Sequence, residues 1–359
     1  MTEASHPIVI DNKISPKLNA FLRAGKYSSY FIICDSNTLQ YCLPVLLQSC
    51  KALSKAGLIE LEPGEANKEL DVVAGIWQTL TEHGADKKAL IINLGGGTVS
   101  DTGGFAASTF KRGIDYINIP TTLLAMVDAG IGGKTGINFG NIKNHIGSVV
   151  QPKGIFINTA FLNTLPFAQL NSGYAEVIKT ALIADKKLFQ QTCGLNISAS
   201  FPVKSIVQRS ADLKNAIVKK DPEEKGLRKI LNFGHSVGHA LESLYMEKPE
   251  PMLHGEAVAI GMAVESYISL LRKKLSQKEF SDIVNCLSLN FKLPLLEEKD
   301  EERFFAFLKQ DKKNRDQSFY FALLHHIGKC EPAVKVTEAQ VKKALQYYNR
   351  FLANAPALQ

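Results

Sequence analysis

The residues of this chain with the most evident chemical potential are histidines and acidic residues in its second half. Leu231–His239 and Leu253–Glu256 together hold three of the eight histidines. His235 and His239 are four residues apart, so on a helix both rings would lie on one face and could bind one metal ion. His254 follows at the start of a long apolar run. A catalytic metal also needs a ligand of another type and an open coordination position, and spacing alone leaves open how the set is completed.

A carboxylate upstream is a candidate for the missing ligand. Glu176 and Lys179 are three residues apart in the segment Gly173–Lys179. Such a pair on a helix is usually an exposed ion pair of small energetic value. Here the flanking residues are apolar, so both charges could instead point inward. Glu176 is therefore the candidate third ligand.

A polar stripe leads into the histidine segment. Arg228, Asn232, His235 and His239 recur at helical spacing among apolar neighbours. A polar stripe on a helix usually faces solvent. The combination of guanidinium, amide and imidazole groups between apolar residues instead suits a polyhydroxylated, anionic substrate.

The first half contains a glycine-rich turn, Gly95–Asp101, between a predicted strand and a predicted helix. Glycine lets backbone amides approach a phosphate, and the amino end of a helix favours negative charge. The dinucleotide fingerprint G-x-G-x-x-G is absent, so the turn fits a plain strand-to-helix connection equally well. Asp35, at the end of an earlier predicted strand, is placed where a carboxylate can accept from ribose hydroxyls.

A second glycine-rich stretch spans residues 121–145. It contains Thr121, Asp128, Lys134 and Asn144, which are polar groups that could contact a ligand. The stretch is too polar for a core and too rich in glycine for a stable helix. It therefore favours a substrate or cofactor loop.

The elements that must position these groups change character along the chain. Short apolar runs at 30–34, 89–94, 116–119 and 154–157 predict buried strands, with a helix predicted at 71–83. From about Leu170, helical periodicity predicts helices at 173–189, 203–220, 235–245, 255–271, 277–287, 301–309 and 338–352. Strands alternating with helices are typical of a parallel α/β sheet. We therefore predict an α/β domain at residues 1–168 and a mainly α-helical domain at 169–359.

Composition excludes several classes of protein. The net charge is +7 and the pI about 8.9, but the lysines are dispersed with no long basic run, which argues against nucleic-acid binding. No apolar run reaches the length of a membrane span, and no secretory signal is visible. The six cysteines are scattered without a C-x-x-C pair, which indicates free thiols in a cytoplasmic enzyme.

Taken together, the motifs resemble the 3-dehydroquinate synthase family. The resemblance rests on Gly95-Gly-Gly-x-x-x-Asp101, Arg112-Gly113, Ile119–Asp128, Gly132–Gly136, Lys143-Asn144, Tyr174–Lys179, Arg228–His239, Leu253–Glu256 and Asp311–Lys313. It extends from about residue 60 to 315, and the motifs are long enough to make chance similarity implausible.

The resemblance implies a Rossmann-like N-terminal domain that binds NAD and a helical C-terminal domain that binds metal and substrate, with the active site in the cleft between them. It also implies a homodimer, and a divalent metal that is usually zinc, with cobalt possible. The implied metal ligands are Glu176, His235 and His254. His239 then becomes a substrate or proton-relay group, which revises the pairing suggested by spacing alone.

The resemblance also implies contact residues. Those for NAD are Asp35, Glu65, Lys68, Gly97, Thr98, Val99, Ser100, Asp101, Thr121, Thr122, Lys134, Lys143, Phe161, Leu162, Asn163 and Thr164. Those for substrate and catalysis are Arg112, Asp128, Lys134, Asn144, Lys179, Lys214, Glu224, Arg228, Asn232, His239 and Lys312, where the doublet with Lys313 leaves the choice of lysine open.

The implied reaction converts 3-deoxy-D-arabino-heptulosonate 7-phosphate, a small anionic sugar phosphate, to 3-dehydroquinate and phosphate in the shikimate pathway. It proceeds by transient oxidation at C4 by NAD, elimination of phosphate, reduction, ring opening and intramolecular aldol closure. Two alternatives remain: another sugar-phosphate cyclase, or a metal-dependent polyol dehydrogenase of similar architecture.

Overall fold

The computed structural model describes residues 6–140, 142–195, 197, 202–246, 248, 250–310 and 318–353. The chain divides into two compact units. The first comprises Met1–Pro166 with Val203–Ala211, and the second comprises Phe167–Pro202 with Asp212–Gln359. The domain bounds 1–168 and 169–359 remain a prediction.

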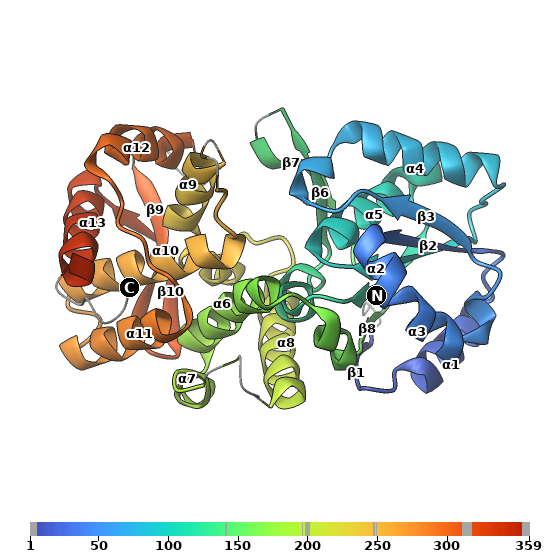
Figure 1. The fold of residues 1–359 in the computed structure, drawn as a ribbon, viewed down its shortest axis with the longest axis horizontal. Coiled ribbons are helices and arrows are strands. Elements are labelled where there is room, and N and C mark those ends of the chain that lie inside the picture. The colour runs from blue at the N-terminus through green and yellow to red at the C-terminus, as the bar shows by residue number, and fades with distance from the viewer. Residues whose placement is uncertain are drawn as a thin grey trace. The chain divides into compact units, whose positions relative to one another are not determined.

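The first unit is built on a six-stranded parallel sheet (Figure 1). In spatial order its strands are β1 (Ile8–Ile10), β8 (Ile155–Ile157), β5 (Asp115–Pro120), β4 (Leu90–Gly95), β2 (Tyr30–Asp35) and β3 (Gly57–Leu61). Every residue of β4 is buried, as expected for a strand with both faces covered. The chain leaves β2 toward β3 and leaves β4 toward β5, so a topological switch point lies between β2 and β4. Ligands of open α/β sheets bind at such a point, beyond the carboxyl ends of the strands.

Helices cover this sheet and pack against its apolar side chains. They are α1 (Ser15–Gly25), α2 (Ser36–Tyr41), α3 (Leu43–Ser49), α4 (Leu70–Glu82) and α5 (Gly97–Thr109). On α4, Val73, Ile76 and Leu80 recur at helical spacing and join a core with Ile33 and Ile91 of the sheet.

Residues 121–145, predicted to be a ligand loop, contain regular structure. A π-helical turn spans Ala125–Ala129, and the antiparallel strands β6 (Lys134–Phe139) and β7 (Ile142–Val149) form a hairpin. Small residues allow the hairpin to pack closely on α5, because a Cβ on Gly104 would lie 2.5 Å from Thr135 Cγ2. Polarity and glycine content predicted a ligand loop here, whereas the structure has a π-helical turn and a hairpin that packs on Gly104 of α5.

The second unit is rich in helices (Figure 1). They are α6 (Phe167–Ala184), α7 (Lys186–Thr192), α8 (Val203–Lys220, whose first residues belong to the first unit), α9 (His235–Tyr245), α10 (His254–Leu271), α11 (Gln277–Asn290), α12 (Glu301–Gln310) and α13 (Glu338–Ala353). The single helix predicted at 173–189 is two helices. Asp185 ends the first and caps the second, accepting hydrogen bonds from the amides of Lys187 and Leu188.

One hairpin of this unit was not predicted from the sequence. The antiparallel strands β9 (Phe319–His326) and β10 (Lys329–Val336) form a hairpin with two register shifts. The predicted fold class, a Rossmann-like α/β domain followed by a mainly helical one, is nevertheless confirmed. None of the helices in the described ranges has both the length and the hydropathy that crossing a membrane requires.

Candidate functional site

The glycine turn after β4 is shaped for close backbone approach. A Cβ on Gly95 would lie 2.5 Å from Val99 Cβ, and one on Gly96 would lie 3.0 Å from Thr122 Cγ2. Helix α5 begins at Gly97 without a capping side chain. Its first amides therefore have no partner within the helix and can bind an anion.

Most of the residues predicted to contact NAD gather at the same edge of the sheet. Asp35 ends β2, Glu65 and Lys68 follow β3, Thr121 and Thr122 follow β5, and the 3₁₀ helix Thr159–Thr164 follows β8. The Thr121 hydroxyl is buried and, within the described residues, has no hydrogen-bond partner, so a ligand at this edge could provide one. Within Phe161–Thr164, Phe161 and Leu162 are buried, whereas Asn163 and Thr164 are exposed.

Asp35 also caps helix α2. Its Oδ1 accepts hydrogen bonds from the amide of Thr38 at 2.8 Å and from the Thr38 hydroxyl at 3.0 Å. These bonds cap α2 and fix the direction of the carboxylate.

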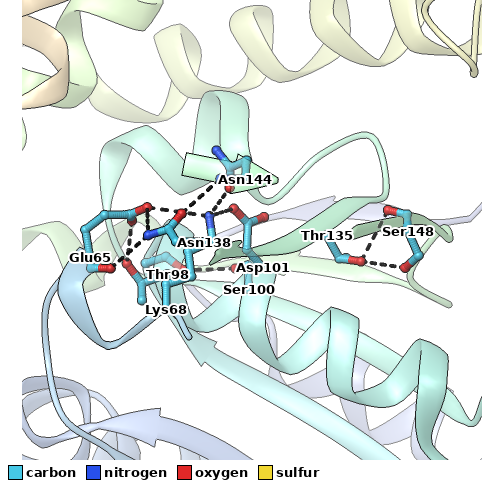
Figure 2. Close-up of polar contacts among 10 residues, drawn as sticks. Glu65, Lys68, Thr98, Ser100, Asp101, Thr135, Asn138, Asn144 and Ser148 are labelled. Atoms are coloured by element: carbon cyan, nitrogen blue, oxygen red, sulfur yellow. Dashed lines mark hydrogen bonds and ion pairs between the residues drawn. The ribbon is translucent and has the colours of Figure 1, made fainter. Parts of the chain in front are cut away.

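A polar network ties the turn Glu65–Lys68 to α5 and to the β6–β7 hairpin (Figure 2). Lys68 Nζ lies 2.6 Å from Asp101 Oδ2 and 2.5 Å from Asn144 Oδ1. Asn138 donates from its side-chain amide to the backbone oxygen and to Oε1 of Glu65, both at 3.3 Å. The network brings predicted NAD residues and one predicted substrate residue together.

Arg112 is not brought to this edge. It follows the carboxyl end of α5, directly before β5 begins at Asp115, which pairs with the first residue of β4. Arg112 therefore lies at the amino edge of the sheet, opposite the glycine turn. Its backbone is left-handed, with φ +64°, an uncommon conformation for a residue with a side chain.

The remaining predicted residues of the first unit are spread along the hairpin and the turn before it. Lys134 pairs with Val149 at one end of the hairpin, whereas Lys143 and Asn144 lie near its turn. Asp128 lies in the π-helical turn. Lys134 and Asn144 are therefore separated along the strands.

In the second unit, three helices bring Glu176, His235 and His254 together. One potential ligand atom from each residue lies within 4.8 Å of the others. Glu176 Oε1 is 3.6 Å from His235 Nε2 and 3.4 Å from His254 Nε2. Glu176 is on α6, His235 is the first residue of α9 and His254 is the first residue of α10.

This arrangement fits a divalent metal. Ligand atoms about 3.4 Å apart suit a tetrahedral ion with bonds of roughly 2.1 Å to nitrogen and carboxylate oxygen. His235 Nδ1 lies 3.1 Å from the Phe233 carbonyl, and donation to that oxygen leaves Nε2 as a lone-pair donor. Glu176 is completely buried and its Oε2 is paired with Lys179, itself buried. The pair is therefore not the exposed ion pair that spacing alone allows.

Sequence reasoning missed Glu242, which contacts a candidate ligand. Its Oε2 lies 3.3 Å from His254 Nδ1. Burial lowers the pKa of His254, but the carboxylates of Glu242 and Glu176 outweigh this effect and raise the pKa to about 10. The available signal was helical spacing, since Glu242 follows His235 and His239 on one face of α9.

Sequence reasoning also missed Glu265, a completely buried carboxylate on α10. It accepts hydrogen bonds from the amides of Gly234 at 2.7 Å and Val237 at 3.2 Å. These are amides at the amino end of α9, where negative charge is favourable. Glu265 therefore anchors the helix end that carries His235. An acidic residue within an apolar helical run was the signal.

Four of the predicted substrate residues of this unit lie between positions 224 and 239. Asn232 donates to Glu224 Oε1 at 2.7 Å, and Arg228 Nη1 donates to the Pro222 carbonyl at 2.7 Å. Asp221 shapes this segment by accepting from the amide of Arg228 at 2.9 Å. His239 is exposed, with its ring centroid 5.3 Å from that of His235.

Two further lysines were predicted to contact the substrate. Lys214, on α8, is buried. Lys312 lies outside the described residues.

Comparison with protein families identifies the relatives of the chain. Residues 58–172 match the family model of the 3-dehydroquinate synthase N-terminal domain, and residues 173–314 match that of the C-terminal domain. The chain belongs to the 3-dehydroquinate synthase family. The resemblance inferred from the motifs is thereby confirmed.

Curated members of the 3-dehydroquinate synthase family match nearly the whole chain. The 3-dehydroquinate synthase of Parabacteroides distasonis is 40% identical, with 95% of this chain and 97% of the relative covered. That of Ruminiclostridium cellulolyticum is 35% identical, with 96% and 97% covered.

Solved structures of other enzymes share this fold. The 2-epi-5-epi-valiolone synthase of Streptomyces hygroscopicus subsp. jinggangensis, solved with NAD⁺ and Zn²⁺ bound, is 28% identical, with a TM-score of 0.83 and 98% of both chains covered. A glycerol dehydrogenase of Schizosaccharomyces pombe shares the fold alone, at 14% identity and a TM-score of 0.64, with 97% of this chain and 90% of that one covered.

Proposed function

We propose that this protein catalyses the 3-dehydroquinate synthase reaction, converting 3-deoxy-D-arabino-heptulosonate 7-phosphate to 3-dehydroquinate and phosphate in the shikimate pathway. One observation carries the proposal. A chain of this family brings a buried carboxylate and two imidazoles together with the spacing of a divalent metal site.

The cofactors are NAD and a divalent metal, with zinc proposed and cobalt as the alternative. When bound, NAD accepts and later returns a hydride, while the metal lowers the pKa of a substrate hydroxyl. Glu176, His235 and His254 hold the metal. The glycine turn, Asp35 and the threonines after β5 hold NAD, with the open amides of α5 facing its phosphates.

The other polar groups of the second unit bind and orient the substrate. Lys179 and Lys214 are buried cations suited to an anionic ligand. Asn232 and Glu224, already joined by a hydrogen bond, offer a donor and an acceptor to hydroxyls. His239, exposed beside the metal ligands, is placed to move a proton at a substrate oxygen.

Within the first unit, Lys134 and Asn144 are proposed to contact the substrate at separate points, because they are spaced along the hairpin. Asp128 and Lys312 remain proposals from family resemblance. The same applies to Arg112, which does not share an edge of the sheet with the glycine turn.

The alternative is another sugar-phosphate cyclase, favoured by the 28% identity to a valiolone synthase. The curated 3-dehydroquinate synthases are more similar, at 35–42% identity. A polyol dehydrogenase shares the fold, but it would accumulate NADH. We further propose a cytoplasmic homodimer, as family resemblance implies.

The decisive experiment supplies purified protein with NAD, zinc and the heptulosonate phosphate, and follows phosphate, dehydroquinate and absorbance of NADH. We expect phosphate and dehydroquinate in equal amounts without accumulating NADH, because the hydride is returned in each turnover. Turnover of a different sugar phosphate with none of the heptulosonate would replace this proposal by the cyclase alternative. Net NADH formation would support a dehydrogenase.

A further inference from the structure

The two imidazole ligands proposed for the metal both begin helices. His235 is the first residue of α9 and His254 is the first residue of α10. Side chains of a helix lean toward its amino end, so a metal held by these rings lies beside the amino ends of both helices. The amino end of a helix carries a partial positive charge. A divalent cation is therefore repelled there unless negative charge compensates.

Helix α10 carries a compensating charge of its own. Glu256 lies in its first turn, and its Oε2 accepts a hydrogen bond from the Leu253 amide at 2.9 Å. The Gly255 amide donates to the Ser172 hydroxyl, also at 2.9 Å. The amino end of α10 therefore has an acidic side chain, and two of its amides have partners.

Helix α9 receives its acidic group from a neighbouring helix. Its first five residues, His235-Ser-Val-Gly-His239, include no acidic residue, and the residue before them is Gly234, which has no side chain to cap the helix. The carboxylate comes instead from Glu265 on α10, whose two oxygens accept from the amides of Gly234 and Val237. Glu265 is completely buried, and hydrogen bonds from two amides favour the ionised form of a carboxyl group. A buried negative charge therefore lies at the amino end of α9.

The proposed ligands themselves supply little net negative charge. The carboxylate of Glu176 is already paired with a buried ammonium. Glu242 lies 3.3 Å from Nδ1 of His254, whereas Nδ1 of His235 faces an uncharged backbone carbonyl. On the His235 side of the site, compensation for a metal therefore comes from Glu265.

We propose that Glu265 is a positioning residue that also supplies the negative charge a divalent metal requires beside α9, and that it raises metal affinity through His235 without contacting the metal. This inference rests on the proposed function, in which Glu176, His235 and His254 hold the metal. The consequence is that the charge of Glu265, and not only the hydrogen bonds that it accepts, sets the affinity for metal.

The test compares Glu265→Gln with Glu279→Gln in the full-length protein. Glu279, in the first turn of α11, likewise accepts from two backbone amides, those of Ser276 and Ile327, and α11 carries none of the proposed metal ligands. In Glu265→Gln we expect the zinc dissociation constant, measured by competition with a chromophoric chelator, to rise about 10- to 30-fold. In Glu279→Gln it should change less than about twofold. The absorption bands of Co²⁺-loaded Glu265→Gln should keep their positions, because the three ligands are unchanged.

A second variant separates charge from hydrogen bonding and guards against misfolding. Glu265→Asp keeps the negative charge, but its shorter side chain should not reach both amides at once. We expect Glu265→Asp and Glu265→Gln to lower the urea midpoint of the metal-free protein by similar amounts, because each loses a bond to a buried amide. The zinc dissociation constant of Glu265→Asp should nevertheless stay within about threefold of that of the unaltered protein.

Equal zinc affinity in Glu265→Gln and Glu279→Gln would overturn the proposal and make Glu265 a structural cap alone. An equal loss of affinity in Glu265→Gln and Glu265→Asp would also overturn it, since the hydrogen bonds would then set the affinity. If the unaltered protein bound zinc but released no phosphate from the heptulosonate phosphate, the proposed reaction would fail, whereas the zinc affinities would still decide the role of Glu265.

Discussion

At the scale of single residues, the second unit surrounds its candidate metal ligands with groups that set their orientation. Glu242 lies 3.3 Å from His254 Nδ1, and Phe233 provides a carbonyl 3.1 Å from His235 Nδ1. Each contact fixes which ring nitrogen faces Glu176. Partners of this kind raise the basicity of a ligating imidazole and hold its ring in place.

Glu242→Gln should therefore weaken metal binding without abolishing it, because the amide can still accept a hydrogen bond from His254 but lacks the charge. We expect the metal dissociation constant to rise about 10- to 100-fold, measured by competition with a chromophoric chelator. Glu176→Gln, which changes the proposed ligand itself, should lose bound metal completely. Glu302→Gln, exposed on α12, is the matched control. Equal affinity in Glu242→Gln and the control would show that Glu242 does not support the site.

At the scale of elements, glycines decide how closely α9 and α10 approach. A Cβ on Gly261 of α10 would overlap the carbonyl oxygen of Gly234 and lie 3.0 Å from the Gly238 amide. Backbone atoms cannot move aside as a flexible side chain can. This contact sets the separation of the two helices whose first residues are His235 and His254.

Gly261→Ala should accordingly lower the free energy of unfolding by about 3 kcal/mol, because overpacking forces the two backbones apart. Gly75→Ala on α4 is the matched control, since nothing lies within 4 Å of its added Cβ, and it should stabilise the protein by about 0.5–1 kcal/mol. Urea unfolding of both variants measures the difference. Equal midpoints for the two would contradict the close packing described here.

The predicted and observed elements differ in ways that show what the sequence alone can predict. The segment 235–245 was predicted with the bounds that α9 has, because its apolar positions recur at helical spacing. The stretch 121–145 was predicted to be a ligand loop, but most of its second half belongs to the β6–β7 hairpin. The hairpin is held by contacts with other elements, such as Lys68 with Asn144 (Figure 2) and Ser108 of α5 with Ser148, which the local sequence pattern does not contain. Glu176 was found from its apolar flanks, whereas Glu242 and Glu265 act through partners that only the fold brings close.

At the scale of the whole molecule, the residues proposed for the two cofactors belong to different units. The residues proposed for NAD lie between Asp35 and Thr164, within the first unit, and the proposed metal ligands lie between Glu176 and His254, within the second. None of the proposed metal ligands is also a proposed NAD contact. The two cofactors should therefore bind with little thermodynamic coupling.

Removal of the metal tests this independence. After dialysis against a chelator, we expect phosphate release to stop, because the substrate hydroxyl is no longer activated. The NAD dissociation constant should change by less than about twofold, since coupling requires that one ligand alter the contacts of the other. Added zinc should restore phosphate release, and the Glu176→Gln protein, prepared without chelator, should bind NAD as the dialysed protein does. An NAD dissociation constant raised tenfold or more in both metal-free samples would contradict independent sites and require a shared conformational change of the two units.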